Sequence, residues 1–426
     1  MNEKGMTLGR DGNSLQNKKV HRRRMFYIPG YDPIHPRRYR ELYRKEGAAQ
    51  ADISGYDIAL KAKEAKTGPY GWQVCSLIDD IDVSTDVEVL VWSDIVRESM
   101  KNSILETYLQ LARTAWVYIT TGTLRRLMRL RKGPVIAALY PVGMLLIQAV
   151  LAMVLALGVA WATVAMAGYF AIFGVVVHLV SLGLGLLAGA MLMRWFKKMD
   201  SKFFAYYLMH DYAYSASSKG AYSPALEGRI AEFTALIQTA LSDDTLDEVL
   251  VVGHSSGVHI AVSALSDLIR SGLPNGHPPL GFLSLGQVVP MVSFLPKAYR
   301  LRADLKFLSQ RDELAWVDVT APGDGCAFAL CDPVSVSGVA SDGKRWPLVF
   351  SAAFTQTLSP QRWAELRWRF FRLHFQYLCA FDRPGDYDYF QVTAGPLTLR
   401  ERYRNRQPSR SRIDQTVSKF TTMTAP

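Results

Sequence analysis

One serine in this sequence lies at a tight junction between a strand pattern and a helix pattern. The largely apolar residues 247–252 predict a strand, and residues 258–262 predict a helix that follows almost at once. The junction between them is Gly253-His254-Ser255-Ser256-Gly257. A serine on so short a turn has its hydroxyl directed outward, and glycines two positions before and after it let the strand and the helix pack closely. The spacing therefore makes Ser255 a candidate nucleophile.

This junction resembles the nucleophile elbow of the α/β-hydrolases, in the GHSxG form common among lipases and esterases. An earlier segment resembles an early strand and the oxyanion loop of that family, namely Met25-Phe26-Tyr27-Ile28-Pro29-Gly30-Tyr31-Asp32. The family often has His-Gly in this loop, where this chain has Pro29-Gly30. The resemblance covers residues 25–92 and 200–396. It implies an α/β fold with a mostly parallel sheet flanked by helices.

The resemblance also implies an acid and a base, since the family order is nucleophile, acid, then base. Asp324 follows a strand pattern at 314–319 and is the expected acid, with Asp332 as the alternative. His374 is the only histidine after Asp324 and is the expected base. The residues before it have a helical pattern, which is also typical of a histidine that only packs in a core.

Two backbone groups are the expected donors to a tetrahedral oxyanion. They are the N–H groups of Tyr31 and Ser256, and no role is expected for the Ser256 hydroxyl. Gly253, His254 and Gly257 shape the turn, and His254 is expected to point away from the active face. Together these residues predict acyl transfer to water, with an ester or another acyl compound as substrate.

Neither a metal nor an organic cofactor is expected. The four cysteines, at positions 75, 326, 331 and 379, form no CxxC pair. His254 and His259 lack the HExxH spacing of a zinc site. The sequence also lacks the GxxxxGK[ST] and GxGxxG motifs of phosphate-binding loops.

The residues between the two hydrolase-like segments predict a membrane insertion. No Asp, Glu, Lys or Arg occurs from Gly133 to Met193, and an amphipathic helix pattern at 98–130 leads into this run. One membrane-spanning helix needs about 20 residues, so two spans are expected, at 137–164 and 170–193, with a turn at 167–169. Basic residues flank the run on both sides, which by the positive-inside rule places the catalytic domain and both termini in the cytoplasm.

The charge of the chain also bears on its expected partner. Its formal net charge is +11, from 49 Lys and Arg against 38 Asp and Glu. Basic clusters can bind nucleic acid, but no zinc-finger, RRM or KH motif accompanies them here. Because several of them lie beside the apolar run, a lipid bilayer is the expected partner and nucleic acid is not.

The expected organisation is one soluble domain interrupted by the membrane insertion. Residues 1–24 form a disordered basic N-terminus, and residues 25–97 form the first part of the hydrolase domain. Residues 98–199 form the amphipathic helix and the hairpin, and residues 200–406 form the second part. Residues 407–426, rich in Ser and Thr, are expected to be a disordered tail.

The sequence therefore favours a membrane-anchored serine hydrolase that cleaves esters through an acyl-enzyme on Ser255. A membrane location favours lipid-like esters, although fold and location do not by themselves define a substrate. The alternative, of a different class, is a catalytically inactive hydrolase fold that serves as a membrane scaffold or interaction protein.

Overall fold

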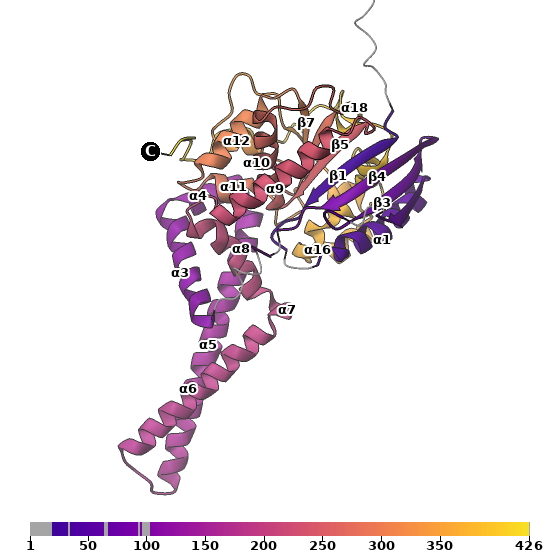
Figure 1. Cartoon of the computed structure of the whole chain (residues 1–426). Helices are drawn as coiled ribbons and strands as arrows, with labels where there is room; N and C mark the ends of the chain where they lie inside the picture. Colours follow the sequence, from indigo (N-terminus) through magenta and orange to yellow (C-terminus); the bar gives the residue numbers. More distant parts are fainter. Residues whose placement is uncertain (1–18, 33–34, 64–66, 93, 96–102, 426) are drawn as a thin grey trace, which may run out of the picture.

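Strands from both soluble segments form one central sheet. The computed structural model describes residues 19–32, 35–63, 67–92, 94–95 and 103–425 (Figure 1). Within these residues eight strands pair in the order β2-β3-β4-β1-β5-β6-β7-β8. Their bounds are β1 Arg22–Ile28, β2 Asp57–Ala62, β3 Gly71–Ile78, β4 Ile81–Val89, β5 Glu248–His254, β6 Leu280–Leu285, β7 Leu314–Thr320 and β8 Leu348–Ser351.

Most of this sheet is parallel, as expected for an α/β architecture. The strands from β4 to β8 in the spatial order are parallel to their neighbours, and β2 and β3 extend the sheet as antiparallel strands. Parallel strands end at the same edge of a sheet, so the loops after β1, β5 and β7 meet there. β1 begins at Arg22, inside the segment 1–24 expected to be disordered; residues 1–18 of that segment lie outside the described residues.

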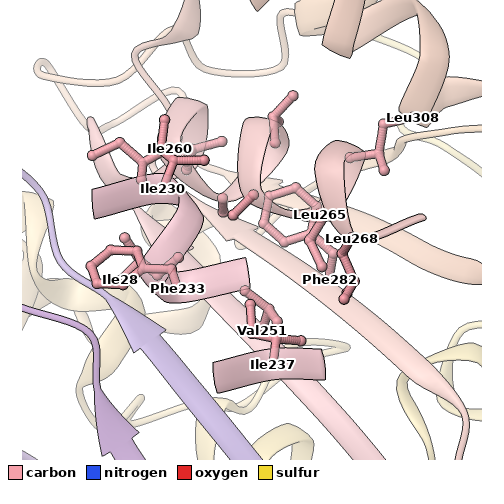
Figure 2. Close-up of a cluster of buried hydrophobic side chains, with 14 of the residues drawn as sticks. Ile28, Ile230, Phe233, Ile237, Val251, Ile260, Leu265, Leu268, Phe282 and Leu308 are labelled. Atoms are coloured by element: carbon pink, nitrogen blue, oxygen red, sulfur yellow. The ribbon is translucent and has the colours of Figure 1, made fainter. Parts of the chain in front are cut away.

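Helices cover both faces of the sheet, and the buried residues of the central strands alternate between two cores. Val249 and Val251 of β5 belong to one core with α9 Pro224–Leu241, α10 Gly257–Arg270 and α12 Tyr299–Ser309 (Figure 2). Leu250 and Val252 belong to the other, with α1 Arg37–Ser54, α17 Tyr389–Ala394 and α18 Leu399–Arg402. Shorter helices complete the domain: α11 Val289–Ser293, α13 Pro333–Val336, α14 Phe354–Thr357, α15 Pro360–Leu366, α16 Phe370–His374 and the 3₁₀ helix η1 Gln376–Leu378.

A group of helices forms a neck between the sheet domain and the hairpin. The amphipathic pattern at 98–130 corresponds to α3 Ile104–Thr120 and α4 Thr123–Leu130, and residues 98–102 lie outside the described residues. α3 packs against α8 Ala205–Ser217, which follows the hairpin and the short α7 Asp200–Phe203. The hydroxyls of Tyr118 and Thr123 donate to the carbonyl oxygens of Met291 and Phe294, at 3.0 and 3.1 Å. These bonds tie the neck to the residues that follow β6.

Two helices beyond the neck are long and apolar enough to cross a membrane. They are α5 Lys132–Tyr169 and α6 Val175–Lys198, and they project together from the body of the protein (Figure 1). The chain reverses at residues 170–174, after the expected turn at 167–169, and Gly174 there has a φ of 134°. Positive φ of this kind is accessible to glycine, which explains why the turn falls at this position.

The first part of α5 packs against helices of the neck, within the expected first span at 137–164. Leu145 and Gln148 are buried, and the Tyr108 hydroxyl donates to the carbonyl oxygen of Leu145 at 2.6 Å. The uncharged run is longer than two spans require because its beginning packs against protein. Farther along, a Cβ atom on Gly185 of α6 would lie 2.4 Å from the carbonyl oxygen of Ala156, so glycine lets the two apolar helices approach closely.

The C-terminal residues pack on the domain and do not form the disordered tail expected at 407–426. The backbone of Ile413 pairs with Leu330 and Asp332, and the buried Arg302 donates to the carbonyl oxygen of Thr422 at 2.7 Å. The Ser/Thr-rich composition indicated disorder, but these hydrogen bonds satisfy the backbone of the segment against the domain.

A buried ion pair joins the two central strands at their amino ends, opposite the edge where the loops meet. Nε of Arg23 in β1 lies 2.6 Å from a carboxylate oxygen of Glu248 in β5, and the side chains are 0% and 1% exposed. The Arg23 guanidinium also donates to the carbonyl oxygens of Gly395 and Leu397, at 3.0 and 2.9 Å. A buried charge is tolerated when its partners compensate for the lost water, as they do here.

Glu248→Ala leaves the Arg23 charge buried without its carboxylate. We predict a loss of about 3–5 kcal/mol in the free energy of unfolding, measured by chemical denaturation of the detergent-solubilised protein. The control is Glu41→Ala, which removes an exposed ion pair with Arg44 and should leave the free energy of unfolding nearly unchanged, because water screens exposed charges. Equal stability of the two variants would contradict this account of the buried pair.

Candidate active site

Ser255 occupies the turn between β5 and α10 in a strained backbone conformation. Its φ is 57°, in the left-handed region that residues other than glycine rarely adopt. A Cβ atom on Gly257 would lie 2.2 Å from the carbonyl oxygen of Ile28 and 2.4 Å from that of Pro29, so only glycine fits. This close approach holds the start of α10 against the end of β1. The turn therefore has the geometry that directs a serine hydroxyl outward from a sheet.

Asp324 and His374, the expected acid and base, are hydrogen-bonded to each other. Nδ1 of His374 lies 2.7 Å from Oδ2 of Asp324, which is buried in the loop after β7. Asp324 also accepts a hydrogen bond from the backbone N–H of Cys326 at 2.8 Å. A carboxylate on Nδ1 orients the imidazole and leaves Nε2 as the nitrogen that can accept a proton.

Asp332, the alternative acid, lies at the start of a different helix. Its carboxylate accepts from the N–H groups of Val334 and Ser335, at 3.0 and 3.1 Å, and forms an ion pair with Lys344. It therefore caps α13 and balances a lysine. The structure brings Asp324 to His374, and it does not bring Asp332 there.

One cavity of about 600 Å³ has both Ser255 and His374 in its wall. Loops at the edge of the sheet, helices of the neck and residues of α1, α10, α11 and α16 supply the rest of the wall. Its apolar and aromatic members include Tyr118, Pro134, Phe204, Tyr207, Leu208, Met291, Val292, Phe371 and Phe375. A concave, largely apolar cavity with a few convergent polar groups is the usual form of a small-molecule site.

The base and the candidate nucleophile share this cavity without a hydrogen bond between them. Nε2 of His374 is buried and has no hydrogen-bond partner among the described residues. Catalytic hydrogen bonds are often long outside the substrate complex and shorten within it. The structure thus provides the orientation of His374, and proton transfer requires a closer approach of the two side chains.

Only one of the two expected oxyanion donors is already hydrogen-bonded. The backbone N–H of Tyr31 donates to the hydroxyl of Ser256 at 2.8 Å, so this hydroxyl has a role that the sequence did not indicate. Among the described residues, no hydrogen bond uses the backbone N–H of Ser256. Gly30 lies against the serine, since a Cβ atom there would lie 3.0 Å from Cβ of Ser255 and 3.4 Å from its Oγ. Of the two expected donors, the N–H of Tyr31 is already hydrogen-bonded, and the N–H of Ser256 has no acceptor among the described residues.

His254 lies in the cavity wall, not away from the site as expected. Its ring centroid is 4.8 Å from that of His374, and its Nε2 donates to the carbonyl oxygen of His374 at 3.1 Å. Burial, together with the charge of a protonated His374, lowers the pKa of His254 to about 3. His254 is therefore neutral near pH 7 and acts as a hydrogen-bond donor that holds the backbone of the base.

Tyr377 is a functional candidate that the sequence analysis missed. Its hydroxyl donates to Oδ2 of Asp324 at 3.0 Å and accepts from the N–H of Ala321 at 2.9 Å. Burial, and next the negative charge of Asp324, raise the pKa of Tyr377 well above its ordinary value, so the hydroxyl stays protonated. Its spacing of three residues from His374 was the available signal, since this spacing places two side chains on one side of a helical turn.

A polar cluster at the cavity also escaped the sequence analysis. The Tyr39 hydroxyl and the Arg38 guanidinium donate to Oδ2 of Asp32, at 2.7 and 3.3 Å. The guanidinium of Arg38 lies 4.6 Å from the ring centroid of Phe375. Asp32 belongs to the loop after β1, but nothing in the sequence paired it with residues of α1. These groups give one side of the apolar cavity a fixed polar surface.

Asp324, Cys326 and His374 also have residue types that bind metal ions. Their ligand atoms lie within 4.8 Å of one another. Both oxygens of Asp324 already accept hydrogen bonds. Burial, and next the charge of Asp324, raise the pKa of the Cys326 thiol well above its ordinary value, which disfavours the thiolate that a metal requires. The cluster is better suited to proton transfer than to metal binding.

Comparisons of this chain with protein-family models, with curated proteins and with solved structures gave no match. Any assignment of function therefore depends on the residues and geometry described above.

Buried histidines should make the protein lose stability in acid. Burial lowers the pKa of His254 to about 3 and that of His259 to about 4, from an ordinary value of 6.5. The unfolded chain binds these protons below pH 6.5 and the folded chain does not, so stability falls as pH decreases from 6.5 towards 4. We predict that His259→Gln makes the free energy of unfolding depend less steeply on pH, by about 1.4 kcal/mol per pH unit. Urea unfolding in detergent across this pH range measures this dependence. Parallel curves of unfolding free energy against pH for the parent and the variant would contradict the prediction.

Proposed function

We propose that the protein is a membrane-anchored serine hydrolase that cleaves carboxylic esters through an acyl-enzyme on Ser255. The observation that carries the proposal is a single cavity that contains a serine on a strained strand-to-helix turn and a histidine bound to a buried aspartate. These residues occur along the chain in the order serine, aspartate, histidine, which is the order of the α/β-hydrolase triad. A mostly parallel sheet with helices on both faces is consistent with that fold.

The proposed reaction has two steps that reuse the same groups. Oγ of Ser255 attacks the ester carbonyl carbon while Nε2 of His374 takes its proton. The tetrahedral intermediate then expels the alcohol, which receives that proton. In the second step His374 takes a proton from water, the resulting hydroxide attacks the acyl-enzyme, and the acid leaves as Ser255 regains its proton. Asp324 holds the imidazole and stabilises its charged form in both steps.

The oxyanion of each intermediate forms beside the start of α10. We assign the backbone N–H of Ser256 as one donor, because this group lies directly after the nucleophile and has no acceptor among the described residues. The N–H of Tyr31 becomes a second donor when the Ser256 hydroxyl releases it. One oxyanion donor is typically worth about 10²–10³ in kcat.

Ser255→Ala removes the nucleophile, and we predict that it abolishes labelling by a fluorophosphonate probe. Hydrolysis of short p-nitrophenyl esters should fall by roughly 10⁴ to 10⁶ in kcat, because the acyl-enzyme can no longer form. Both are measured on the full chain in detergent. Labelling of the parent at another residue, or equal activity of the two proteins, would refute the assignment.

The acid offers a matched control for the same experiment. Asp324→Asn should lower kcat by about 10⁴, since the imidazole loses the partner that holds its tautomer. Asp332→Asn removes a carboxylate of the same kind from a helix cap and should leave the labelling rate of Ser255 unchanged. A parent protein that is folded but unlabelled would instead favour an inactive hydrolase fold that acts as a scaffold.

We further propose that the hairpin spans the bilayer and that both termini and the sheet domain are cytoplasmic. The support is an even number of apolar helices with basic residues at both of their soluble ends. We predict that a membrane-impermeant maleimide labels Ile172→Cys, in the turn between α5 and α6, only from the non-cytoplasmic side. The control is Thr424→Cys near the C-terminus, labelled only from the cytoplasmic side. The reverse pattern would overturn the topology.

A further inference from the structure

Six consecutive exposed residues before the proposed base are all basic or aromatic. They are Arg367-Trp368-Arg369-Phe370-Phe371-Arg372, called here the aromatic-basic segment, between the end of α15 and the body of α16. Trp368 is 72% exposed, and Phe370 and Phe371 are 42% and 41% exposed. Three large apolar side chains exposed side by side are unusual on a surface that only meets water. This cluster therefore indicates a binding surface.

The aromatic-basic segment lies next to the place where the hairpin joins the body. The ring centroid of Phe371 is 6.4 Å from that of Phe204, the residue between α7 and α8. α7 directly follows α6, whose last turn contains Lys197 and Lys198. Figure 1 shows α16 and α7 on the side of the sheet domain from which the hairpin projects. If α6 crosses the bilayer, these lysines lie at the headgroup level and Phe371 lies just beside it.

The charges of the segment suit an anionic lipid surface. None of the three arginines of the segment forms an ion pair with another described residue. Asp200, an acidic residue at the hairpin junction, accepts hydrogen bonds from the N–H groups of Tyr206 and Tyr207, both at 2.9 Å. Basic side chains attract anionic headgroups, and Trp and Phe are favourable at the boundary between headgroups and acyl chains. Arginines and aromatic residues in one short segment serve both interactions at once.

The cavity of the candidate site reaches the same place. Phe204 and Phe371 belong to the cavity wall that also contains Ser255 and His374, and so does Asp200 at the start of α7. Along α8 the wall continues through Tyr207 and Leu208. The cavity therefore extends from the serine turn to the end of the hairpin. An apolar acyl chain at the bilayer surface could enter it without crossing bulk water.

We infer that the aromatic-basic segment docks on an anionic leaflet and that the substrate is a long-chain acyl ester drawn from that leaflet. The inference rests on the proposed hydrolase function and names its substrate class and its second membrane contact. α16 carries Phe370 and Phe371 of the segment as well as His374. Contact with the bilayer and the position of the base are thus linked through one short helix.

The test compares two substrates on the full chain reconstituted in vesicles of phosphatidylcholine, with or without phosphatidylglycerol. The variants are Trp368→Gln and the double variant Arg367→Gln/Arg369→Gln, none of which lines the cavity. The control is Lys306→Gln on α12, far from the hairpin in Figure 1. With phosphatidylglycerol present, each test variant should hydrolyse a long-chain ester in the vesicle about tenfold more slowly or worse. Hydrolysis of a soluble short-chain ester and fluorophosphonate labelling should not change.

A second measurement reports docking without catalysis. The tryptophan emission lost in Trp368→Gln, obtained as the difference from the parent, isolates this side chain. Brominated acyl chains should quench that difference in vesicles that contain phosphatidylglycerol. A parent that quenches in this way but is not labelled at Ser255 would refute the proposed hydrolase function while supporting the docking surface.

Three results would overturn the inference. The first is an unchanged vesicle rate in both variants, and the second is an equal fall in the rates on both substrates. The third is loss of binding to a soluble polyanion such as heparin in the variants, with vesicle hydrolysis unchanged and no quenching of Trp368 in the parent by brominated lipid. That result would assign the segment to an acidic macromolecule and not to a lipid surface.

Discussion

A Cβ atom on residue 257 would lie 2.2 Å from the carbonyl oxygen of Ile28, and this contact decides how α10 meets the sheet. Gly257 packs on the end of β1 just after the short turn that follows β5. Ser255, within this turn, has a φ of 57°. The same approach places the Ser256 hydroxyl against the N–H of Tyr31, at 2.8 Å. The candidate nucleophile and both oxyanion donors thus depend on one backbone contact.

The strain at Ser255 needs compensation from its surroundings. A residue held in this region of backbone space typically costs about 1–3 kcal/mol. The N–H of Ser255 donates to the carbonyl oxygen of Leu285 in β6 at 2.9 Å, and β5 is buried on both faces. Parallel pairing from β5 to β7 then brings the Asp324 loop to the same edge. A rigid sheet therefore supports a strained turn and aligns the acid with it.

The parts of the site that could be predicted from the sequence are those with local signals. Ser255 directly follows a strongly apolar strand, Asp324 lies in the loop after another, and His374 is the only histidine after Asp324. The role of His254 could not be predicted, because it depends on the packing of its ring against His374, a residue distant in sequence.

The fold could likewise be predicted where the signal is local in the sequence, and not where it depends on contacts between distant residues. The parallel strands and the apolar hairpin were visible as continuous apolar runs. The order of the strands, the neck and the packed C-terminus depend on long-range contacts such as that between Arg302 and Thr422. The start of α5 was assigned to the membrane because its residues are uncharged, and only packing distinguishes a buried apolar helix from a lipid-facing one.

The most direct test of the central claim is a structure of the full chain after reaction with a fluorophosphonate in a lipid nanodisc. The account predicts phosphorus bonded to Oγ of Ser255, a phosphoryl oxygen that accepts from the N–H of Ser256, and Nε2 of His374 within hydrogen-bonding distance of the adduct. His374 should keep its bond to Asp324. An unmodified Ser255, or an adduct whose phosphoryl group lies away from His374, would contradict the account.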